Sequence, residues 1–190
     1  MAYRTVYVFR HGESYDNIDH IFSGWRDSKL APKGVKSAKL LARKLRNKRI
    51  DLAFSSDQTR ALQTLDEVLR FHKGIPVVID ARLRERDYGA LTGKSKDAFE
   101  KQNPRLYMIY HRSYTRSPPK GESFKDVNER VKPFIHDLIK LMKSFKVNVA
   151  ISAHGNSIRP MRKHFEHLSI AQMRSLENAH DRYWAYRIKV

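Results

Sequence analysis

The sequence predicts an α/β fold, built on a mainly parallel β-sheet that helices cover on both faces. The first observation is that short β-rich runs alternate along the chain with segments of helical periodicity. The second is that arginine, histidine and glutamate residues follow several of these runs, where open α/β sheets place their ligand-binding residues. The chain contains no internal repeat and no linker-like stretch, so we expect residues 1–190 to form one domain.

The first half of the chain is expected to hold three strands and two helices. The β-rich run Thr5–Phe9 is the first strand. After a loop rich in Asp, Ser and Gly, an amphipathic helix runs from about Pro32 to Arg46, with proline in its first turn. Ile50–Phe54 is the second strand, and the N-cap residue types in Ser55–Asp57 open the second helix. Ile75–Ile79 is the third strand.

The second half begins with an irregular stretch and then returns to alternation. Arg82–Gly121 has poor periodicity and a proline pair at Pro118-Pro119, so the sequence assigns no element to it. Ser123 begins a long helix with Asp126 as its capping partner. The predicted buried stripe of that helix is Val127, Val131, Phe134, Ile135, Leu138 and Met142. The remaining elements are a strand at Val147–Ser152, a helix from about Ser157, a short helix near Ile170–Leu176 and a last strand at Tyr183–Ile188.

Composition narrows the class of protein. A hydrophobic fraction of 41% and an aromatic fraction of 11% agree with a folded globular chain. Cysteine is absent, which excludes disulfides, thiolate catalysis and cysteine metal sites. No apolar run is long enough to cross a bilayer, and no secretory segment precedes the first strand. We therefore expect a cytoplasmic protein that does not associate with membranes.

The net charge of +18 first suggests a nucleic-acid binder. However, the positive residues are spread along the chain, and the densest stretch, Lys33–Arg49, alternates them with Val, Ala and Leu. That pattern is typical of a helix with one buried stripe and one solvated face. A positive field also attracts small anionic substrates, so nucleic acid is the less favoured partner and phosphorylated metabolites the more favoured one.

Candidate catalytic residues follow four of the predicted strands. Arg10 and His11 come after the first strand, Arg60 just after the second and His154 after the fourth, while Glu85 lies a few residues beyond the third. Because the carboxyl ends of parallel strands meet at one edge of a sheet, we expect these five side chains to share one site.

These residue types suit phosphoryl transfer without a metal ion. Guanidinium groups of Arg10 and Arg60 match phosphate oxygens with paired hydrogen bonds. Positive neighbours keep the imidazole of His11 neutral and able to attack phosphorus. His154 would stabilise charge on the transferring group, and Glu85 would carry the proton to the leaving oxygen. Backbone N–H groups at Gly12 and beyond are expected to add phosphate donors.

Each residue also has an ordinary interpretation. Arg60 alone fits a helix surface, and Glu85 alone fits an ion pair with Arg82 or Arg86. Five further histidines are expected to be surface or satisfied core residues, namely His20, His72, His164, His167 and His180.

The segment Arg10-His11-Gly12-Glu13-Ser14 resembles the signature of the histidine phosphatase superfamily, and Ser152–Ser157 resembles its second histidine motif. Within that superfamily the chain is most similar to the cofactor-dependent phosphoglycerate mutases. Phe22–Asp27 resembles their FTGWxD segment, Leu83–Gly93 their LNERxYGALxG segment and Ala153–Arg159 their AHGNSLR segment. The resemblance implies a three-layer α/β/α sandwich with a mixed sheet.

The same resemblance implies roles for individual residues. His11 would be the phosphorylated histidine, Glu85 the acid and base, and Arg10, Arg60 and His154 the phosphate pocket. Substrate contacts would come in addition from Asn17, Ser23, Gly24, Tyr88, Lys96, Arg112, Gly155 and Asn156. The implied reaction interconverts 3-phosphoglycerate and 2-phosphoglycerate, with 2,3-bisphosphoglycerate as phosphoryl primer and no metal. The family also makes a homo-oligomer an expectation.

Several features depart from the mutase pattern. Asp16 stands where mutases usually have tryptophan, and His111 replaces the first of a paired arginine. The stretch from Gly93 to Gly121 is shorter than the mutase insertion, the chain stops at Val190 directly after its last strand, and residues 177–180 do not reproduce the mutases' IPTG stretch. A shorter lid favours water as acceptor, so a metal-independent phosphatase acting on small phosphomonoesters is the alternative. A basic nucleic-acid or scaffold protein without activity is the third, least favoured hypothesis.

Overall fold

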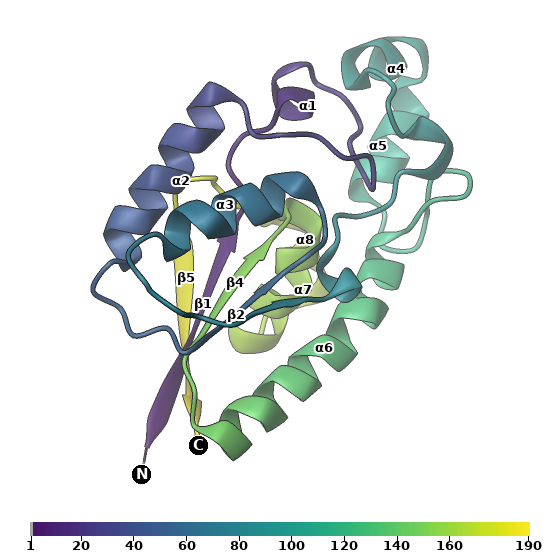
Figure 1. Cartoon of the computed structure of the whole chain (residues 1–190). Coiled ribbons are helices and arrows are strands. Elements are labelled where there is room, and N and C mark those ends of the chain that lie inside the picture. Colours follow the sequence, from purple (N-terminus) through teal and green to yellow (C-terminus); the bar gives the residue numbers. More distant parts are fainter. Residues whose placement is uncertain (1) are drawn as a thin grey trace.

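The computed structural model describes residues 2–190, with the side chain of Arg112 outside that description. Its centre is a five-stranded sheet in the order β3-β2-β4-β1-β5 (Figure 1). The strands are β1 (Tyr3–Arg10), β2 (Leu52–Ser55), β3 (Val77–Ile79), β4 (Val149–Ala153) and β5 (Tyr183–Lys189). Neighbouring strands are parallel except β5, which pairs antiparallel with β1. The predicted mainly parallel, mixed sheet is therefore confirmed.

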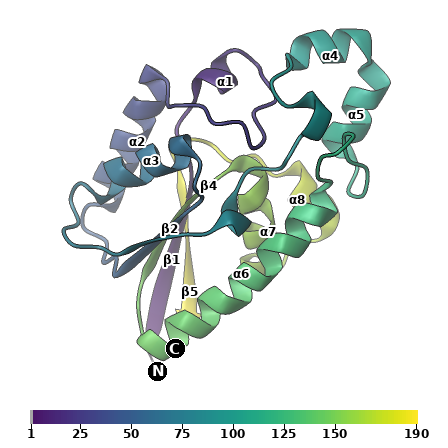
Figure 2. The same cartoon turned by 45° about the vertical axis from the view of Figure 1, so that its right-hand side comes forward.

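Two helical layers enclose this sheet, as the alternation of elements predicted. One face packs against α2 (Pro32–Leu45) and α3 (Thr59–Leu69), and the other against α6 (Phe124–Phe145) and α7 (Gly155–Phe165). The period of two along β1 explains the division, because Val6 and Val8 join the core under α6 while Tyr7 and Phe9 join the core under α2 and α3. The result is a three-layer α/β/α sandwich (Figures 1 and 2).

The longest helix follows its sequence signals closely. Ser123 is the N-cap of α6, and Ser123 and Asp126 form the expected reciprocal capping box. All six residues of the predicted stripe are buried. At the other end, Lys146 takes the left-handed conformation with a φ of 52° and closes the helix.

The predicted start of α3 is wrong by a few residues. The helix begins at Thr59 with Gln58 as N-cap, because the N-cap types before it serve other contacts. Ser55 ends β2, Ser56 hydrogen-bonds His154, and Asp57 pairs with Arg84. Other element ends differ from the predictions by only a few residues.

The stretch of poor periodicity contains short helices that the sequence analysis did not identify. They are the single turns η1 (Ala81–Leu83) and η2 (Gly89–Leu91), followed by α4 (Lys96–Gln102) and α5 (Pro104–Arg112). Helix α4 buries none of its residues, and α5 leaves Leu106 and Met108 exposed. These helices therefore lack the apolar stripe on which periodicity analysis depends.

The elements beyond the carboxyl ends of the parallel strands cover the candidate site. In Figure 2, α1 (Tyr15–Ile18), α4 and α5 lie at that end of the sheet. Isolated bridges join Ser14 to Leu30 and Ile21 to Ser95, which tie the loops together. The last helix, α8 (Ile170–Ser175), packs on α7. No helix in the described part of the chain is long and apolar enough to cross a membrane.

Candidate active site

A cavity of about 700 Å³ lies at the carboxyl edge of the sheet. Most of the residues expected at the site line it, namely Arg10, His11, Asn17, Ser23, Gly24, Arg60, Glu85, Tyr88, Lys96, Gly155 and Asn156. His154 lies directly behind this wall, fully buried, with its ring centroid 4.9 Å from that of His11. The prediction for Arg112 falls on a side chain outside the described residues. Five catalytic candidates from remote parts of the chain thus meet in one place.

His11 follows the last residue of β1 and is held in a single tautomer. Its Nδ1 lies 2.6 Å from the carbonyl oxygen of Gly12, so Nδ1 carries the proton and donates it. The lone pair is therefore on Nε2. Burial above all, and then the neighbouring His154, Arg60 and Arg10, hold the pKa of His11 well below its usual range. At neutral pH the ring is an uncharged nucleophile.

His154 follows β4 and contacts Ser56 from the end of β2. The Oγ of Ser56 is 2.7 Å from Nε2 of His154, and the same oxygen accepts a longer bond from the N–H of Gln58. A serine hydroxyl can donate to a ring nitrogen or accept from one, and either contact fixes the orientation of the His154 ring. The ring is fully buried, and burial holds the pKa of His154 well below its usual range.

The two arginines are anchored by backbone carbonyls. Arg60 donates to the carbonyls of Gly24 and Arg26, and Arg10 donates to the carbonyl of Asn178. The buried Nε of Arg10 has no partner within the described residues. Burial lowers the pKa of both guanidinium groups, while the charge of Glu85 raises it. Fixed guanidiniums with unused donors are well suited to bind a phosphoryl group.

Glu85 presents one carboxyl oxygen to the protein and the other to the cavity. Its Oε1 accepts from the backbone N–H groups of Arg86 at 2.7 Å and of Asn156 at 3.1 Å. Because both partners of Oε1 are donors, a proton bound by this carboxyl resides on Oε2. A methyl group added at Gly155 would stand 3.5 Å from Cζ of Arg10 and 3.7 Å from Oε2 of Glu85. Oε2 therefore lies close to the phosphate-binding groups.

The predicted use of backbone N–H groups at Gly12 is wrong. The N–H of Gly12 donates to Oγ1 of Thr64 at 2.9 Å and is not available to a phosphate. A side chain at Gly12 would come within 2.3 Å of the carbonyl oxygen of Gly34, so this loop is packed against α2 and does not open into a nest. The helix that points its N-terminus at the site is α7, through the N–H of Asn156.

Further polar groups line the cavity. Tyr88 and Asn156 are joined through the phenol oxygen and the amide nitrogen at 3.3 Å, and burial raises the pKa of Tyr88. Burial lowers the pKa of the Lys96 ammonium, which reaches this region from the start of α4. Asn17 caps α1 by accepting from the N–H of Ser14, which fixes the loop before Ser23 and Gly24.

The cavity is also lined by residues to which the sequence analysis assigned no site role. They are Arg86, His111, Phe124, Arg159, Arg162, Glu177, Asn178, Ala179, His180, Arg182 and Trp184. His180 was expected to be an ordinary surface or core histidine. Instead it lies in the cavity wall with Nδ1 2.5 Å from the carbonyl oxygen of His11. Nothing in the residue types of 177–180 indicates this contact, which depends on how β5 starts beside the end of β1.

Two local interpretations of charged residues are also resolved. Glu85 forms no ion pair with Arg82, which pairs with Asp80 and Asp137 instead. Asp16, at the position where mutases usually have tryptophan, is buried, and its Oδ2 lies 3.5 Å from Nε of Arg26. Within residues 2–190, no group of three or more histidine or acidic side chains has an arrangement that would hold a metal ion.

Comparison with known proteins identifies the family. The model for the histidine phosphatase superfamily (branch 1) matches residues 6–185. This chain belongs to the histidine phosphatase superfamily. A relative from Nitrobacter hamburgensis, named 2,3-bisphosphoglycerate-dependent phosphoglycerate mutase, is 40% identical over 185 residues, covering 94% of this chain and 89% of the relative. The sequence resemblance is therefore confirmed.

Solved structures of histidine phosphatase folds superpose on nearly the whole chain. A structure titled mycobacterial hydrolase 1 has a TM-score of 0.86 at 24% identity and covers 98% of this chain and 92% of its own. A mycobacterial glucosyl-3-phosphoglycerate phosphatase has a TM-score of 0.81 at 26% identity, with coverage of 93% and 86%. The chain is thus a histidine phosphatase superfamily enzyme whose relatives include proteins named as mutases and as phosphatases.

Proposed function

We propose that this protein is a 2,3-bisphosphoglycerate-dependent phosphoglycerate mutase that works through a phosphohistidine at His11. The observation that carries the proposal is the state of His11: a neutral ring with its Nε2 lone pair free, in a cavity with Arg10, Arg60 and Glu85. The name shared by relatives at up to 40% identity supports the mutase over other phosphoryl transfers.

The chemistry consists of two transfers that are the reverse of each other. When 2,3-bisphosphoglycerate primes the enzyme, Nε2 of His11 bonds to phosphorus, the P–O bond breaks, and Oε2 of Glu85 gives its proton to the departing oxygen. In the second transfer a hydroxyl of the phosphoglycerate attacks the phosphorus, the P–N bond breaks, and Glu85 takes the hydroxyl proton. Arg10 and Arg60 neutralise charge on the transferring oxygens, and the imidazole of His154 stabilises charge on the same group.

The remaining predicted residues would bind the glycerate part. Tyr88, Lys96 and Asn156 line the outer cavity, and we assign them the hydroxyl and carboxylate of the substrate. Asn17, Ser23, Gly24 and Gly155 also line the cavity, and we assign them contacts with the phosphoryl group. Arg112 keeps the role of a substrate contact as a prediction from the resemblance alone. The partners implied are small phosphorylated metabolites.

A coupled assay tests the proposal. Formation of 2-phosphoglycerate from 3-phosphoglycerate is followed with and without 2,3-bisphosphoglycerate, and release of inorganic phosphate is measured in the same samples. We expect primer-dependent isomerisation that is much faster than phosphate release. Absence of primer-dependent 2-phosphoglycerate would exclude the mutase.

A labelling experiment isolates the nucleophile. His11→Asn should abolish acid-labile phosphoryl labelling by the primer, whereas His136→Asn, on the exposed face of α6, should label like the unaltered protein. Retained labelling of the His11 variant would place the phosphohistidine elsewhere.

A metal-independent phosphatase is the second candidate, favoured by the similarity to a glucosyl-3-phosphoglycerate phosphatase structure. The same first transfer would then be followed by attack of water on phosphohistidine. Release of phosphate from several monoesters at a rate equal to or above isomerisation would support it.

A further inference from the structure

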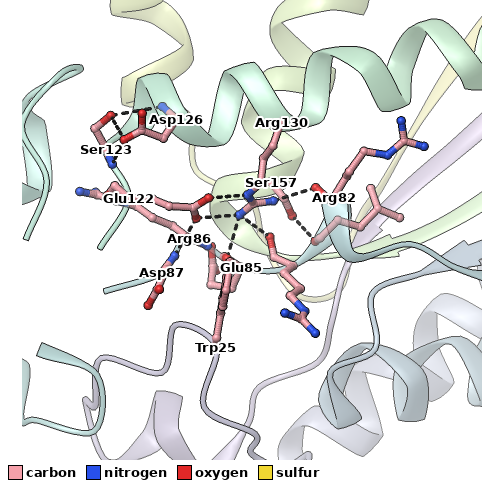
Figure 3. A network of polar contacts seen from close by, with 12 residues as sticks. Trp25, Arg82, Glu85, Arg86, Asp87, Glu122, Ser123, Asp126, Arg130 and Ser157 are labelled. Carbon is pink, nitrogen blue, oxygen red and sulfur yellow. Dashed lines mark hydrogen bonds and ion pairs between the residues drawn. The ribbon is translucent and has the colours of Figure 1, made fainter. Parts of the chain in front are cut away.

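The backbone that carries Glu85 has little regular structure of its own. Residues 84–88 lie between η1 and η2 and belong to neither a strand nor a helix. Their carbonyl and N–H groups are bonded instead by side chains from other elements, and Figure 3 shows these contacts converging around Glu85. The position of the proposed proton carrier therefore depends on those side chains.

Arg130, on α6, provides most of the donors. Its Nη1 donates to the carbonyl of Arg82 at 2.7 Å, and its Nη2 donates to the carbonyls of Arg84 at 3.0 Å and Glu85 at 2.9 Å. The same guanidinium is held by Glu122 through Nε at 2.6 Å and Nη2 at 2.9 Å. A planar guanidinium that is bonded on both edges has little freedom to rotate.

Glu122 holds the loop on the other side of Glu85. Its Oε2 accepts from the N–H of Asp87 at 2.9 Å, and its carbonyl accepts from Nε of Arg86 at 2.6 Å. The pair of Arg130 and Glu122 thus bonds the backbone both before and after the catalytic position. Both side chains of the pair are less than a fifth exposed, so water competes weakly for these bonds.

Three other side chains complete the frame. Nε1 of Trp25 donates to the carbonyl of Glu85, Oε1 of Gln58 accepts from its N–H at 2.9 Å, and Oγ of Ser157 donates to the carbonyl of Leu83 at 2.8 Å. In this frame Arg130 alone contacts three carbonyls, those of Arg82, Arg84 and Glu85, and the last two lie on either side of the Glu85 nitrogen and α-carbon.

We infer that the ion pair of Arg130 and Glu122 positions the Glu85 carboxyl for proton transfer. Neither residue lines the cavity, so each acts through Glu85 and not on the substrate. The route is the 85–86 peptide: its carbonyl is bonded to Arg130, and its N–H donates to Oε1 of Glu85. A tilt of this peptide moves the N–H that orients Oε1, and Oε2 turns away from the leaving oxygen. The inference rests on the proposed function, in which Glu85 carries the proton.

The dependence of the transfer rate on the leaving group distinguishes a positioning role from a merely structural one. Transfer from an alkyl phosphate needs a proton on the departing oxygen, whereas 2,4-dinitrophenolate departs without one. We would measure single-turnover phosphorylation of His11 by 2,3-bisphosphoglycerate and by 2,4-dinitrophenyl phosphate. In Arg130→Met we expect transfer from the alkyl donor to slow by about 10–100-fold, part of the usual effect of a general acid, and transfer from the activated donor to change by less than about threefold.

Arg82→Met is the matched control. Arg82 belongs to the same loop and forms ion pairs with Asp80 and Asp137, but its side chain makes none of the bonds that hold Glu85. Both donors should react with this variant at rates within about threefold of the unaltered protein. Glu122→Gln repeats the test where Arg130→Met does not fold, because it keeps the side-chain shape but presents an N–H₂ group to at least one of the donors that Glu122 now accepts.

Two results would overturn the inference. Equal slowing of both donors in Arg130→Met would show a general loss of the pocket, and unchanged rates for both would show that the pair has no catalytic effect. Failure of the proposed function looks different: without a phosphohistidine mechanism the unaltered protein shows no phosphorylated His11 with either donor, and a phosphatase shows phosphorylated His11 but no primer-dependent isomerisation.

Discussion

Replacement of Glu85 by glutamine removes the transferable proton while keeping most of the local geometry. Oε1 of Glu85 accepts two backbone N–H bonds, from Arg86 and Asn156, and an amide oxygen can accept the same two. The amide nitrogen then takes the place of Oε2 in the cavity. Bonds to a carboxylate exceed bonds to an amide by about 1 kcal/mol each, and loss of a buried charge offsets part of that. The free energy of unfolding should therefore change by less than about 2 kcal/mol.

The loss in catalysis should be much larger than the loss in stability. A positioned general acid contributes about 10²–10⁴-fold to the rate, which corresponds to about 3–5 kcal/mol of transition-state stabilisation. The measurement is kcat for the primed isomerisation, with the inhibition constant of orthovanadate as the readout of phosphate binding. Glu129→Gln, on the exposed surface of α6, is the control. Turnover of Glu85→Gln within threefold of the unaltered protein, with vanadate binding intact, would refute the assignment of the proton carrier.

Three further outcomes follow from the same geometry. Ser56→Ala should slow phosphoryl transfer by about 10-fold because His154 loses the 2.7 Å hydrogen bond that holds its ring in place, and Ser56→Thr should restore the rate; single-turnover kinetics would show the difference. Gly12→Ala should lower the free energy of unfolding by about 2–4 kcal/mol in urea titrations, since its methyl group would meet the carbonyl of Gly34 at 2.3 Å; an unchanged midpoint would contradict the packing. Burial lowers the pKa of His180 to about 4, so its contribution to stability is complete above pH 6.5 and is lost as the pH falls toward 4; His180→Asn should flatten that fall by about 1–2 kcal/mol.

The parts of the fold that sequence analysis predicted are those with strong local signals. The six-residue stripe of α6 and the capping pair of Ser123 and Asp126 specify that helix without help from the rest of the chain. Helices α4 and α5 have no comparable stripe, because they lie over the cavity and bury little surface. Their existence depends on tertiary contacts, such as the bond from Arg86 to the carbonyl of Tyr110, that no local pattern expresses.

The candidate site likewise contains residues that the sequence predicts and residues that it does not. Arg10, His11 and His154 were predictable because each follows a β-rich run, and strand order then brings them together. His180 was not, because its place follows from the antiparallel entry of β5 beside β1 and not from its neighbours in sequence. The N–H of Gly12 was assigned wrongly for a related reason, since its partner Thr64 lies on α3, far away along the chain.

The elements from which the cavity-lining residues come also bear on the choice between mutase and phosphatase. The nucleophile and Arg10 come from the end of a buried strand and Arg60 from the first turn of α3, and both activities need these groups equally. Tyr88 and Lys96 instead line the cavity from an irregular loop and from the start of a helix with no buried residues, and under the proposed function they contact the acceptor of the phosphoryl group. Because transfer to an alcohol in preference to water requires that the alcohol be held and water excluded, selection between the two activities must depend on this less constrained wall. Exchange of residues there should change the ratio of isomerisation to phosphate release while leaving the rate of His11 phosphorylation nearly constant.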